Sequence, residues 1–364
     1  MKFQEIIFFY PSFEKGGVEN IIKNLIEHCL KMKIKIHLVC SKTIIDKKKL
    51  SYYSKVKKFE NRLITSLFSV LNLLNILRIN FKNRKKICLF SLQSNSLAIM
   101  CGKILGYKVV IRNSEYPLGS ISSFDDNILK TILIFFQKII LYNFTDLIIS
   151  NSKGSRNTIR KFIINKKKVI FIYNPYIKKK LKENLTYKKK IVLFVGRFVK
   201  QKGIIFLLKA FLIFSKKYSK FELWFVGDGP DKKLINQFVK ENKIQDKTKI
   251  IPWTKNLKKI YLTSKYFVLP SVYEGLGNVV IEALNYSRTC FVSNCKHGPS
   301  EILINGKGGY IFKSENHIDL YKKLVQAENN YEIAKKKVKY GRKKLNRFLI
   351  NNQSKKFIKA IQSI

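Results

Sequence analysis

The sequence predicts an α/β protein built from two doubly wound parallel sheets, each with helices on both of its faces. Short β-like runs alternate with stretches of helical periodicity along the 364 residues. The alternation stops at a polar, lysine-rich segment, 178–190, and then starts again. A chain of this length is also longer than one hydrophobic core usually serves, so two domains are expected.

The first half starts with a predicted strand over 5–10, a helix over 18–31 and a strand over 34–40. Further predicted strands, separated by helical stretches, lie at 87–90, 108–112, 146–150 and 169–173. In the second half the predicted strands lie at 191–196, 221–227, 249–251, 266–270, 289–293 and 309–312. From about residue 315 onward the pattern is helical and basic.

These patterns divide the chain into a first Rossmann-like domain over 1–177, a linker over 178–190 and a second Rossmann-like domain over 191–345. Residues 346–364 are expected to form a helix that can pack back on the first domain. Ligands of doubly wound sheets bind at the carboxyl ends of the strands, so the two sheets are expected to face a central cleft.

The chain is strongly basic, with 72 Lys and Arg against 23 Asp and Glu and a formal net charge of +49. Such a charge attracts polyanions, which include nucleic acid, anionic lipid and phosphorylated substrates. The alternative is compositional drift, because Lys, Ile, Asn, Phe and Tyr are all abundant, as in a chain from an AT-rich genome.

Cysteine usage and the apolar stretches indicate the cellular compartment in which the protein is expected. Six Cys are scattered without a C-x-x-C pair, which favours thiols in a reducing cytosol over a metal site or disulfides. Residues 1–10 are typical of a strand, not of a signal peptide. The stretches 63–81 and 128–144 are interrupted by charged and amide side chains, so amphipathic helices, core-facing or interfacial, are expected there instead of membrane spans.

In each half of the chain, a glycine-containing turn follows the first predicted strand. Gly16-Gly17 lets backbone N–H groups at a helix start approach an anion, although a Gly-Gly turn can equally be structural. Arg197 and Lys202 flank the turn after the strand at 191–196. Aimed into a cleft, these two cations would neutralise a diphosphate; the alternative is two exposed loop cations.

Two carboxylates are the most informative residues of this basic chain. Glu274 and Glu282 lie on either side of a G-L-G-N segment that follows the strand at 266–270. A carboxylate there can accept hydrogen bonds from vicinal hydroxyls of a sugar or ribose. The intervening Leu276, Gly277 and Asn278 would present backbone N–H groups to a phosphate at a helix start. Two solvated glutamates are the alternative.

Residues 191–312 closely resemble the donor-binding domain of retaining GT-B glycosyltransferases, glycosyltransferase family 4. The similar segments are V-G-R-F-V-K-Q-K-G at 195–203, L-W-F-V-G-D-G-P at 223–230, V-L-P-S-V-Y-E-G-L-G-N-V-V-I-E-A-L at 268–284 and G-P-S-E-I-L at 298–303. In the first half, G-G-V-E at 16–19 and I-S-N-S-K-G-S at 149–155 are also similar, so the resemblance covers about 1–345. It implies a GT-B fold whose first domain binds the acceptor and whose second binds a nucleotide-sugar.

The resemblance also implies roles for individual residues. Arg197 and Lys202 would hold the diphosphate, and with Glu274 they are the expected catalytic residues. Glu274 would bind a hydroxyl of the donor sugar and Glu282 the nucleotide ribose. Backbone contacts to sugar or phosphate would come from Leu276, Gly277 and Asn278, and Gly17 would meet the diphosphate from the other domain. Neither a metal nor a cofactor is expected, because Arg and Lys take the metal's place and no D-x-D pair follows a strand.

One departure from the family concerns the donor sugar. Many members carry a His after a strand of the first domain, where this chain reads I-R-N-S-E-Y-P at 111–117. Asn113 or Glu115 would substitute for that His as a sugar or acceptor contact. The surrounding segment resembles members that transfer hexoses or N-acetylhexosamines from UDP-sugars in surface polysaccharide assembly.

The sequence therefore predicts a retaining glycosyltransferase that uses a nucleotide-sugar, with a UDP-sugar favoured, and a glycan or lipid-linked acceptor. The rival functions are a nucleic-acid-binding protein and a phosphorylase on the same fold. No nucleic acid is expected as a partner, because no recognised module and no interleaving of bases with aromatic residues is present. The phosphorylase is disfavoured because a Lys-anchored cofactor motif is absent from the sequence.

A cytoplasmic enzyme, peripheral on the inner face of the membrane, is expected. Lysine clusters at 47–49, 55–58 and 82–86 bracket the apolar stretch 63–81. If that helix lies on the surface of the first domain, it would form an interfacial anchor for anionic lipid. The alternative is a helix packed in the core, with solvated lysines around it.

Overall fold

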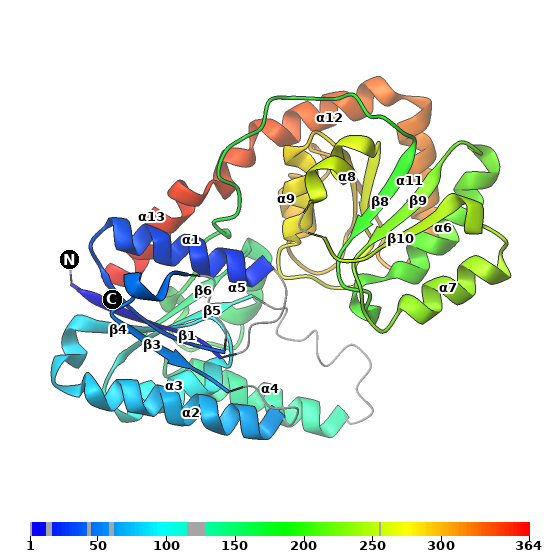
Figure 1. Ribbon diagram of the computed structural model, residues 1–364. Coiled ribbons are helices and arrows are strands. Elements are labelled where there is room, and N and C mark those ends of the chain that lie inside the picture. The colour runs from blue at the N-terminus through cyan, green and yellow to red at the C-terminus, as the bar shows by residue number, and fades with distance from the viewer. Residues whose placement is uncertain (1, 12–16, 42–44, 58–61, 115–127, 255) are drawn as a thin grey trace. The chain divides into compact units, whose positions relative to one another are not determined.

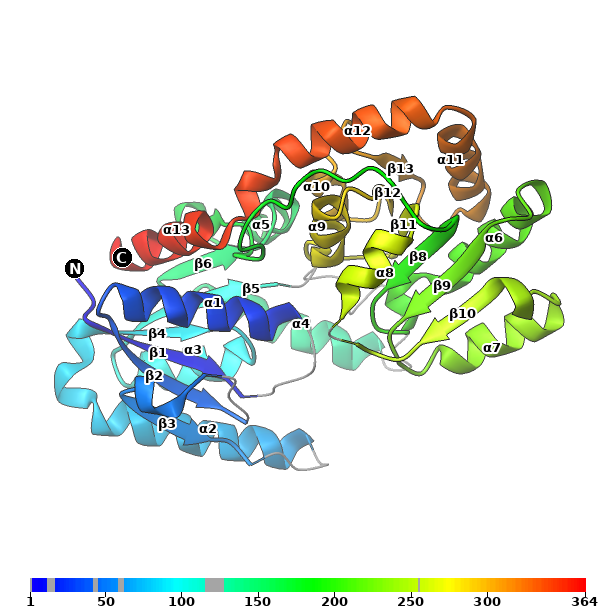
Figure 2. The same cartoon turned by 45° about the horizontal axis from the view of Figure 1, so that its top comes forward.

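The computed structural model describes residues 2–11, 17–41, 45–57, 62–114, 128–254 and 256–364. The chain forms two compact units: unit 1 contains Met1–Lys178 and Phe348–Ile364, and unit 2 contains Lys179–Arg347. Each unit holds one parallel sheet covered by helices (Figures 1 and 2). The predicted fold class, two doubly wound parallel-sheet domains, is therefore confirmed.

In the described residues, the sheet of unit 1 has seven strands in the order β3-β2-β1-β4-β5-β6-β7. Their bounds are β1 Glu5–Tyr10, β2 Lys35–Cys40, β3 Tyr52–Lys55, β4 Ile87–Ser91, β5 Lys108–Asn113, β6 Leu147–Ser150 and β7 Val169–Phe171. The edge strand β3 is absent from the sequence-based prediction. It is short and only half-buried, so it lacks the apolar run that marks the other strands.

Helices cover both faces of this sheet. They are α1 Gly17–Lys31, α2 Arg62–Ile79, α3 Asn95–Ile104, α4 Ile128–Tyr142, α5 Lys153–Arg160 and α13 Ile350–Gln362. Ile6 and Phe8 of β1 belong to the core that α1 and α13 share. Ile7 and Phe9 belong to the core on the other face, to which α2, α3 and α4 contribute. Successive side chains of a strand point to opposite faces, so β1 feeds both cores.

The described sheet of unit 2 has six parallel strands in the order β10-β9-β8-β11-β12-β13. Its strands are β8 Ile191–Val195, β9 Glu222–Val226, β10 Thr248–Ile251, β11 Tyr266–Leu269, β12 Thr289–Ser293 and β13 Tyr310–Phe312. Its helices are α6 Ile204–Lys217, α7 Lys232–Glu241, α8 Leu257–Thr263, α9 Asn278–Asn285, α10 Pro299–Ile302, α11 His317–Asn329 and α12 Tyr331–Lys343. The chain builds outward from β8 through β9 and then returns to add β11 on the other side. The loops after β8 and β11 therefore meet at a topological switch point, where doubly wound sheets bind ligands.

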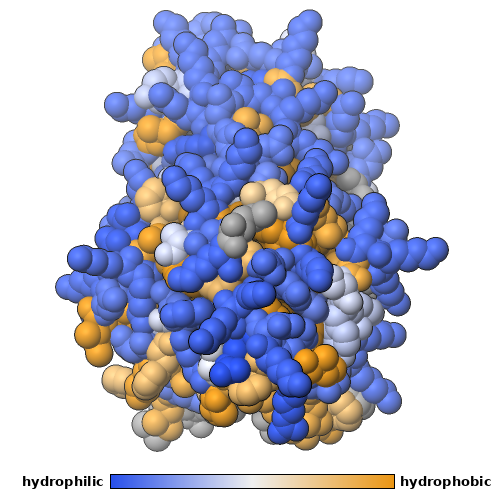
Figure 3. Space-filling view, turned by 90° about the vertical axis from the view of Figure 1, so that its left-hand side faces the viewer, coloured by the Kyte–Doolittle hydropathy of each residue, from blue (hydrophilic) through white to orange (hydrophobic). Residues whose placement is uncertain are grey.

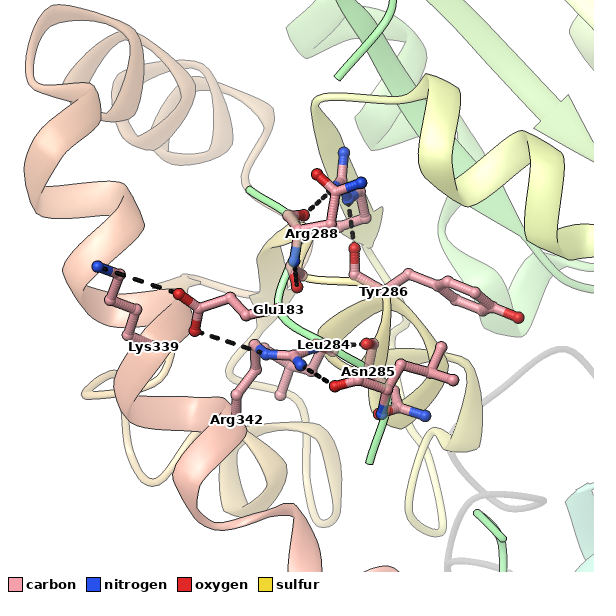
Figure 4. A network of polar contacts seen from close by, with 10 residues as sticks. Glu183, Leu284, Asn285, Tyr286, Arg288, Lys339 and Arg342 are labelled. Carbon is pink, nitrogen blue, oxygen red and sulfur yellow. Dashed lines mark hydrogen bonds and ion pairs between the residues drawn. The ribbon is translucent and has the colours of Figure 1, made fainter. Parts of the chain in front are cut away.

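Residues 179–186 lie in the segment expected as a linker. Two buried arginines hold this segment against unit 2 through hydrogen bonds to its backbone (Figure 4). Arg342 of α12 donates to the carbonyl oxygen of Leu284 at 3.0 Å and to that of Leu181 at 2.6 Å. Arg288 donates to the carbonyl oxygen of Thr186 at 2.8 Å. Leu181 and Thr186 belong to a segment that is neither helix nor strand, so these guanidinium groups supply hydrogen-bond donors that regular secondary structure does not provide there.

The two apolar stretches of the sequence are the helices α2 and α4. In the part of the chain that the structure describes, neither these nor any other helix combines the length and the apolar character that crossing a membrane requires.

Replacing Arg342 by Leu is expected to lower the free energy of unfolding of unit 2 by about 3 kcal/mol, because buried carbonyl groups lose a charged donor. Both tryptophans of the chain, Trp224 and Trp253, belong to unit 2, so denaturant unfolding followed by tryptophan fluorescence reports on this unit. Lys339→Ala is the matched control on the same helix, since Lys339 is exposed and lies 4.0 Å from Glu183. A change of about 0.5 kcal/mol or less is expected for it. Equal effects of the two substitutions would contradict the role given to Arg342.

Candidate functional site

The candidate site is built on the β8–α6 loop, residues 196–203, and the β11–α9 loop, residues 270–277. The backbone N–H of Val272 donates to the carbonyl oxygen of Gln201 at 2.9 Å. In return, Nε2 of Gln201 donates to the carbonyl oxygen of Tyr273 at 3.0 Å. Because β8 and β11 are neighbouring strands, these bonds hold the two loops together at the carboxyl edge of the sheet.

Lys202 and Glu274 join the same two loops through an ion pair between Nζ and Oε1. The hydroxyl of Ser271 donates to the same oxygen, Oε1, at 2.9 Å. Glu274 is only 7% exposed, so its carboxylate is held by a cation and a hydroxyl in a largely desolvated place. An ion pair of this kind is rigid, because breaking it would leave a buried charge without its partner.

A glycine makes the close contact between the two loops possible. Gly203 has φ +60°, and a Cβ placed on it would lie 2.2 Å from the carbonyl oxygen of Pro270. Any other residue would both strain the backbone and push the β11–α9 loop away. The Gly at 203 is therefore required by the packing of the site and not only by the turn.

The loop after β12 supports the site from a third direction. Tyr273 and Lys296 form a parallel β-bridge between this loop and the β11–α9 loop. A Cβ on Gly298, which has φ +77°, would lie 2.5 Å from Cα of Leu276. Gly277, with φ +82°, precedes Asn278, the first residue of α9. The first N–H groups of a helix can bind an anion, and this role of the start of α9 stays a prediction.

Glu282 lies within α9 and is half-buried. Its Oε2 accepts a hydrogen bond from the hydroxyl of Tyr261 at 3.1 Å. Tyr261 in turn stacks on Tyr286, with ring centroids 5.2 Å apart. Burial and the nearby Glu282 raise the pKa of Tyr286. Glu282 thus has a fixed orientation within unit 2.

Arg197 is exposed at the start of the β8–α6 loop, directly after the buried Gly196. Of the other predicted residues, Lys202 and Glu274 are in direct contact. Leu276 and Gly277 lie in the β11–α9 loop, and Asn278 is the first residue of α9. Glu282 lies on α9, with Tyr261 as its hydrogen-bond donor. The roles of these residues toward a ligand stay predictions.

In unit 1, Gly17 is the first residue of α1. Asn113 ends β5, is 2% exposed and donates through Nδ2 to the hydroxyl of Ser155 at 3.1 Å. Glu115 and Gly16 lie outside the described residues. Asn113 is therefore part of a buried polar network, and its contact with a sugar stays a prediction.

That network is a feature that sequence reasoning missed. At the carboxyl edge of the sheet, Nδ2 of Asn95 donates to the carbonyl oxygen of Arg112 at 3.1 Å. The guanidinium of Arg112 donates to Oδ1 of Asn174 at 2.6 Å. A signal was present, because the predicted strands of the first half run into polar residues at Ser91, Asn113, Asn151 and Asn174.

The thiols near these sites are not poised for chemistry. Burial raises the pKa of Cys295, in the loop after β12, to about 12. A thiol with such a pKa is protonated at neutral pH and is a poor nucleophile. Within the described residues, the His, Cys, Asp and Glu side chains do not gather in groups of three that could hold a metal ion.

Gly203→Ala is expected to destabilise unit 2 by more than the roughly 1–2 kcal/mol that a left-handed conformation costs a non-glycine residue. The excess arises because the new Cβ displaces the carbonyl of Pro270. Gly306→Ala is the matched control: Gly306 has φ +91°, but its Cβ would meet only Ile311, at 3.8 Å. Denaturant unfolding of both variants separates backbone strain from the clash. An equal loss in both would show that the loop contact adds nothing.

Comparisons with known proteins agree with this architecture. Residues 176–344 match the family described as "Glycosyl transferases group 1". A relative from Campylobacter jejuni subsp. jejuni serotype O:2 is 24% identical over 376 residues, covering 98% of this chain and 99% of that protein. It is named N-acetylgalactosamine-N,N'-diacetylbacillosaminyl-diphospho-undecaprenol 4-alpha-N-acetylgalactosaminyltransferase.

Two solved structures extend the similarity of fold over nearly the whole chain. Anabaena HepE in complex with UDP and glucose has a TM-score of 0.78 and 13% identity, covering 99% of each chain. The sucrose-phosphate synthase from Thermosynechococcus elongatus has a TM-score of 0.79 and 15% identity, covering 99% of this chain and 98% of that one. The two parallel-sheet units, the family match within the second half and the full-length relative together identify the chain as a glycosyltransferase with the GT-B fold.

Proposed function

We propose that this glycosyltransferase moves a hexose or N-acetylhexosamine from a nucleotide-sugar, with a UDP-sugar favoured, to a lipid-linked or surface-polysaccharide acceptor, and that it retains the anomeric configuration. The observation that carries the proposal is the contact between the two loops of unit 2. It holds a lysine, a glutamate and a helix start at the switch point of the sheet. Retention and the donor class are supported by the resemblance of the segments at 195–203 and 268–284 to retaining family members.

The leaving group of this reaction is a nucleoside diphosphate, on which negative charge builds as the glycosidic bond breaks. Arg197, Lys202 and the first N–H groups of α9 are the groups that would stabilise this charge. No metal or other cofactor is proposed, since Arg197 and Lys202 would stabilise the charge of the diphosphate. Their effect would be largest in the transition state, where the charge on the phosphate is greatest.

Glu274 and Glu282 would orient the donor. Both donors to Glu274, from Lys202 and Ser271, reach Oε1. Its Oε2 is then the atom that would accept a hydrogen bond from a hydroxyl of the donor sugar. Glu282 would accept hydrogen bonds from the ribose hydroxyls, with Tyr261 fixing the carboxylate from the protein side.

Retention would proceed by attack on the face from which the diphosphate leaves. The bond between the anomeric carbon and the phosphate oxygen breaks, and the bond to the acceptor oxygen forms on the same face. The acceptor's proton passes to the departing phosphate oxygen. No protein nucleophile takes part, so the paired carboxylates of glycosidases are not the model for this site.

The acceptor class rests on the relative from Campylobacter jejuni, whose name specifies a diphospho-undecaprenol substrate. Transfer to such a lipid-linked acceptor would place the enzyme in the cytoplasm, peripheral on the inner face of the membrane. The test is to incubate the purified protein with a panel of nucleotide-sugars. We expect one of them, a UDP-sugar, to be hydrolysed slowly and to raise the melting temperature. If no nucleotide-sugar does either, the proposed function is wrong.

Glu282→Ala is expected to weaken donor binding by about 2–4 kcal/mol, because two ribose hydroxyls lose a charged partner. Calorimetric titration with the nucleotide-sugar measures this loss. Glu332→Ala is the control, since the Glu332 side chain is 74% exposed on α12. Tryptophan fluorescence unfolding checks that Glu282→Ala still folds. Unchanged affinity in a folded variant would remove Glu282 from the donor site.

Arg197→Ala and Lys202→Ala are each expected to lower kcat by about 10²–10³, with a smaller effect on the donor KM, because their contact with the diphosphate strengthens as it leaves. Lys200→Ala is the control, because Lys200 is an exposed cation in the same loop. Steady-state kinetics separates the two parameters. A variant with a raised KM and an intact kcat would contradict the assignment.

A further inference from the structure

Unit 1 exposes apolar side chains on three adjacent helices, α2, α3 and α4. On α4, Leu133, Phe136 and Ile140 recur at helical spacing and are between 58% and 62% exposed. Figure 3 shows hydrophobic residues gathered towards the lower end of unit 1, where Figure 1 has α2 and α4, below a mostly hydrophilic face. Exposed apolar residues are ordinary when scattered, but a continuous apolar surface indicates an interaction site.

The neighbouring helices extend this surface. On α2, Leu67 and Leu71 are 58% and 53% exposed, whereas Leu73, Ile76 and Leu77 are buried in the core. On α3, which packs against both α2 and α4, Ile104 is 79% exposed. The helix α2 thus has one side in the core and one exposed apolar side, and the interfacial alternative for 63–81 concerns the exposed side. We call the outer side of α2, α3 and α4 the apolar surface.

The charged side chains on the three helices and on the segment that follows α2 are all basic in the described chain. Residues 62–114 and 128–145 contain no Asp or Glu. The short 3-10 helix that follows α2, Phe81–Lys86, carries the exposed side chains of Lys82, Lys85 and Lys86. The next carboxylate along the chain, Asp146, is already paired with Lys103 and Lys108. The partner that this surface fits is therefore both apolar and anionic.

A second copy of this chain does not meet that requirement. Self-association through the apolar surface would bring two sets of lysines together, and each copy has a net charge of +49. An anionic lipid bilayer meets it fully, since its headgroups bind Lys and its acyl region accepts Phe, Ile and Leu.

We propose that the apolar surface docks in the plane of an anionic bilayer, with Phe136 and Ile140 entering the acyl boundary and Lys82, Lys85 and Lys86 at the headgroups. This deepens the proposed transfer to a lipid-linked acceptor and names the surface that would bring the enzyme to it. Helix α4 ends at Tyr142, just before β6 begins at Leu147, so its last turn lies near the amino edge of the sheet and its first turn points towards the carboxyl edge. The docked surface therefore reaches the edge of unit 1 at which ligands bind.

Vesicle sedimentation of the full chain tests this proposal. Wild-type protein is expected to sediment with phosphatidylglycerol-containing vesicles, to be released by salt, and to stay in solution with phosphatidylcholine vesicles. Lys82→Glu, Lys85→Glu and Lys86→Glu, combined, should lower the partition coefficient at least about tenfold. The matched control reverses three exposed lysines of α7 in unit 2, Lys232, Lys233 and Lys240, with the same change in net charge and an expected loss of less than about twofold.

The apolar contribution has its own pair of variants. Phe136→Ser with Ile140→Ser should also weaken vesicle binding, whereas Ile333→Ser, at an exposed position of α12 in unit 2, should not. Melting curves confirm that each variant folds. Equal losses in the two lysine triples, binding to neutral vesicles as strong as to anionic ones, or no binding at low salt would each overturn the proposal. Dimerisation through the apolar surface, seen by analytical ultracentrifugation as loss of dimer in Phe136→Ser with Ile140→Ser, would also overturn it.

Hydrolysis of the nucleotide-sugar without lipid, measured on the same variants, separates this proposal from the proposed function. Hydrolysis that survives while vesicle binding fails leaves the glycosyltransferase assignment intact and removes only the docking surface. Vesicle binding without hydrolysis of any nucleotide-sugar does the reverse.

Discussion

The candidate site depends on the close approach of two loops that belong to neighbouring strands but are about 70 residues apart in the chain, as with Lys202 and Glu274. The approach needs a glycine at 203, because the carbonyl of Pro270 occupies the place of any Cβ. Once the loops are in contact, Gln201 and the backbone of Val272 fix their register. The start of α9 follows directly from this arrangement, so its N–H groups are presented at the switch point of the sheet.

Much of the fold could be predicted from the sequence, because buried parallel strands are short apolar runs with polar ends. The two sheets and nearly all of their strands follow from that pattern. Strand β3 does not, because an edge strand with half-buried tyrosines and a lysine carries no such signal. The split burial of α2 was also out of reach: leucines all round a helix show that it is apolar but not which side faces the core.

The candidate site was predicted in part. Resemblance to a family pointed to Arg197, Lys202, Glu274 and Glu282, but spacing could not reveal that Lys202 and Glu274 form an ion pair. The bonds from Arg342 to Leu181 and from Arg288 to Thr186 were equally invisible, since each joins residues more than 100 positions apart. Sequence periodicity reports which side chains are buried, whereas such polar contacts depend on where separate segments meet.

Helix α13 belongs to unit 1, although unit 2 lies between it and the rest of that unit in the chain. Phe357 and Ile361 are fully buried in the core that α13 shares with α1. The amide of Gln362 donates to the carbonyl oxygen of Phe3, and its Oε1 accepts from the N–H of Phe3, both at 2.8 Å. During translation, unit 2 is a continuous segment and can fold as it leaves the ribosome. The part of the unit 1 core that α13 covers must instead stay uncovered until residues 350–362 have emerged, so the ribosome-bound chain passes through a stage in which chaperones can bind its exposed apolar side chains.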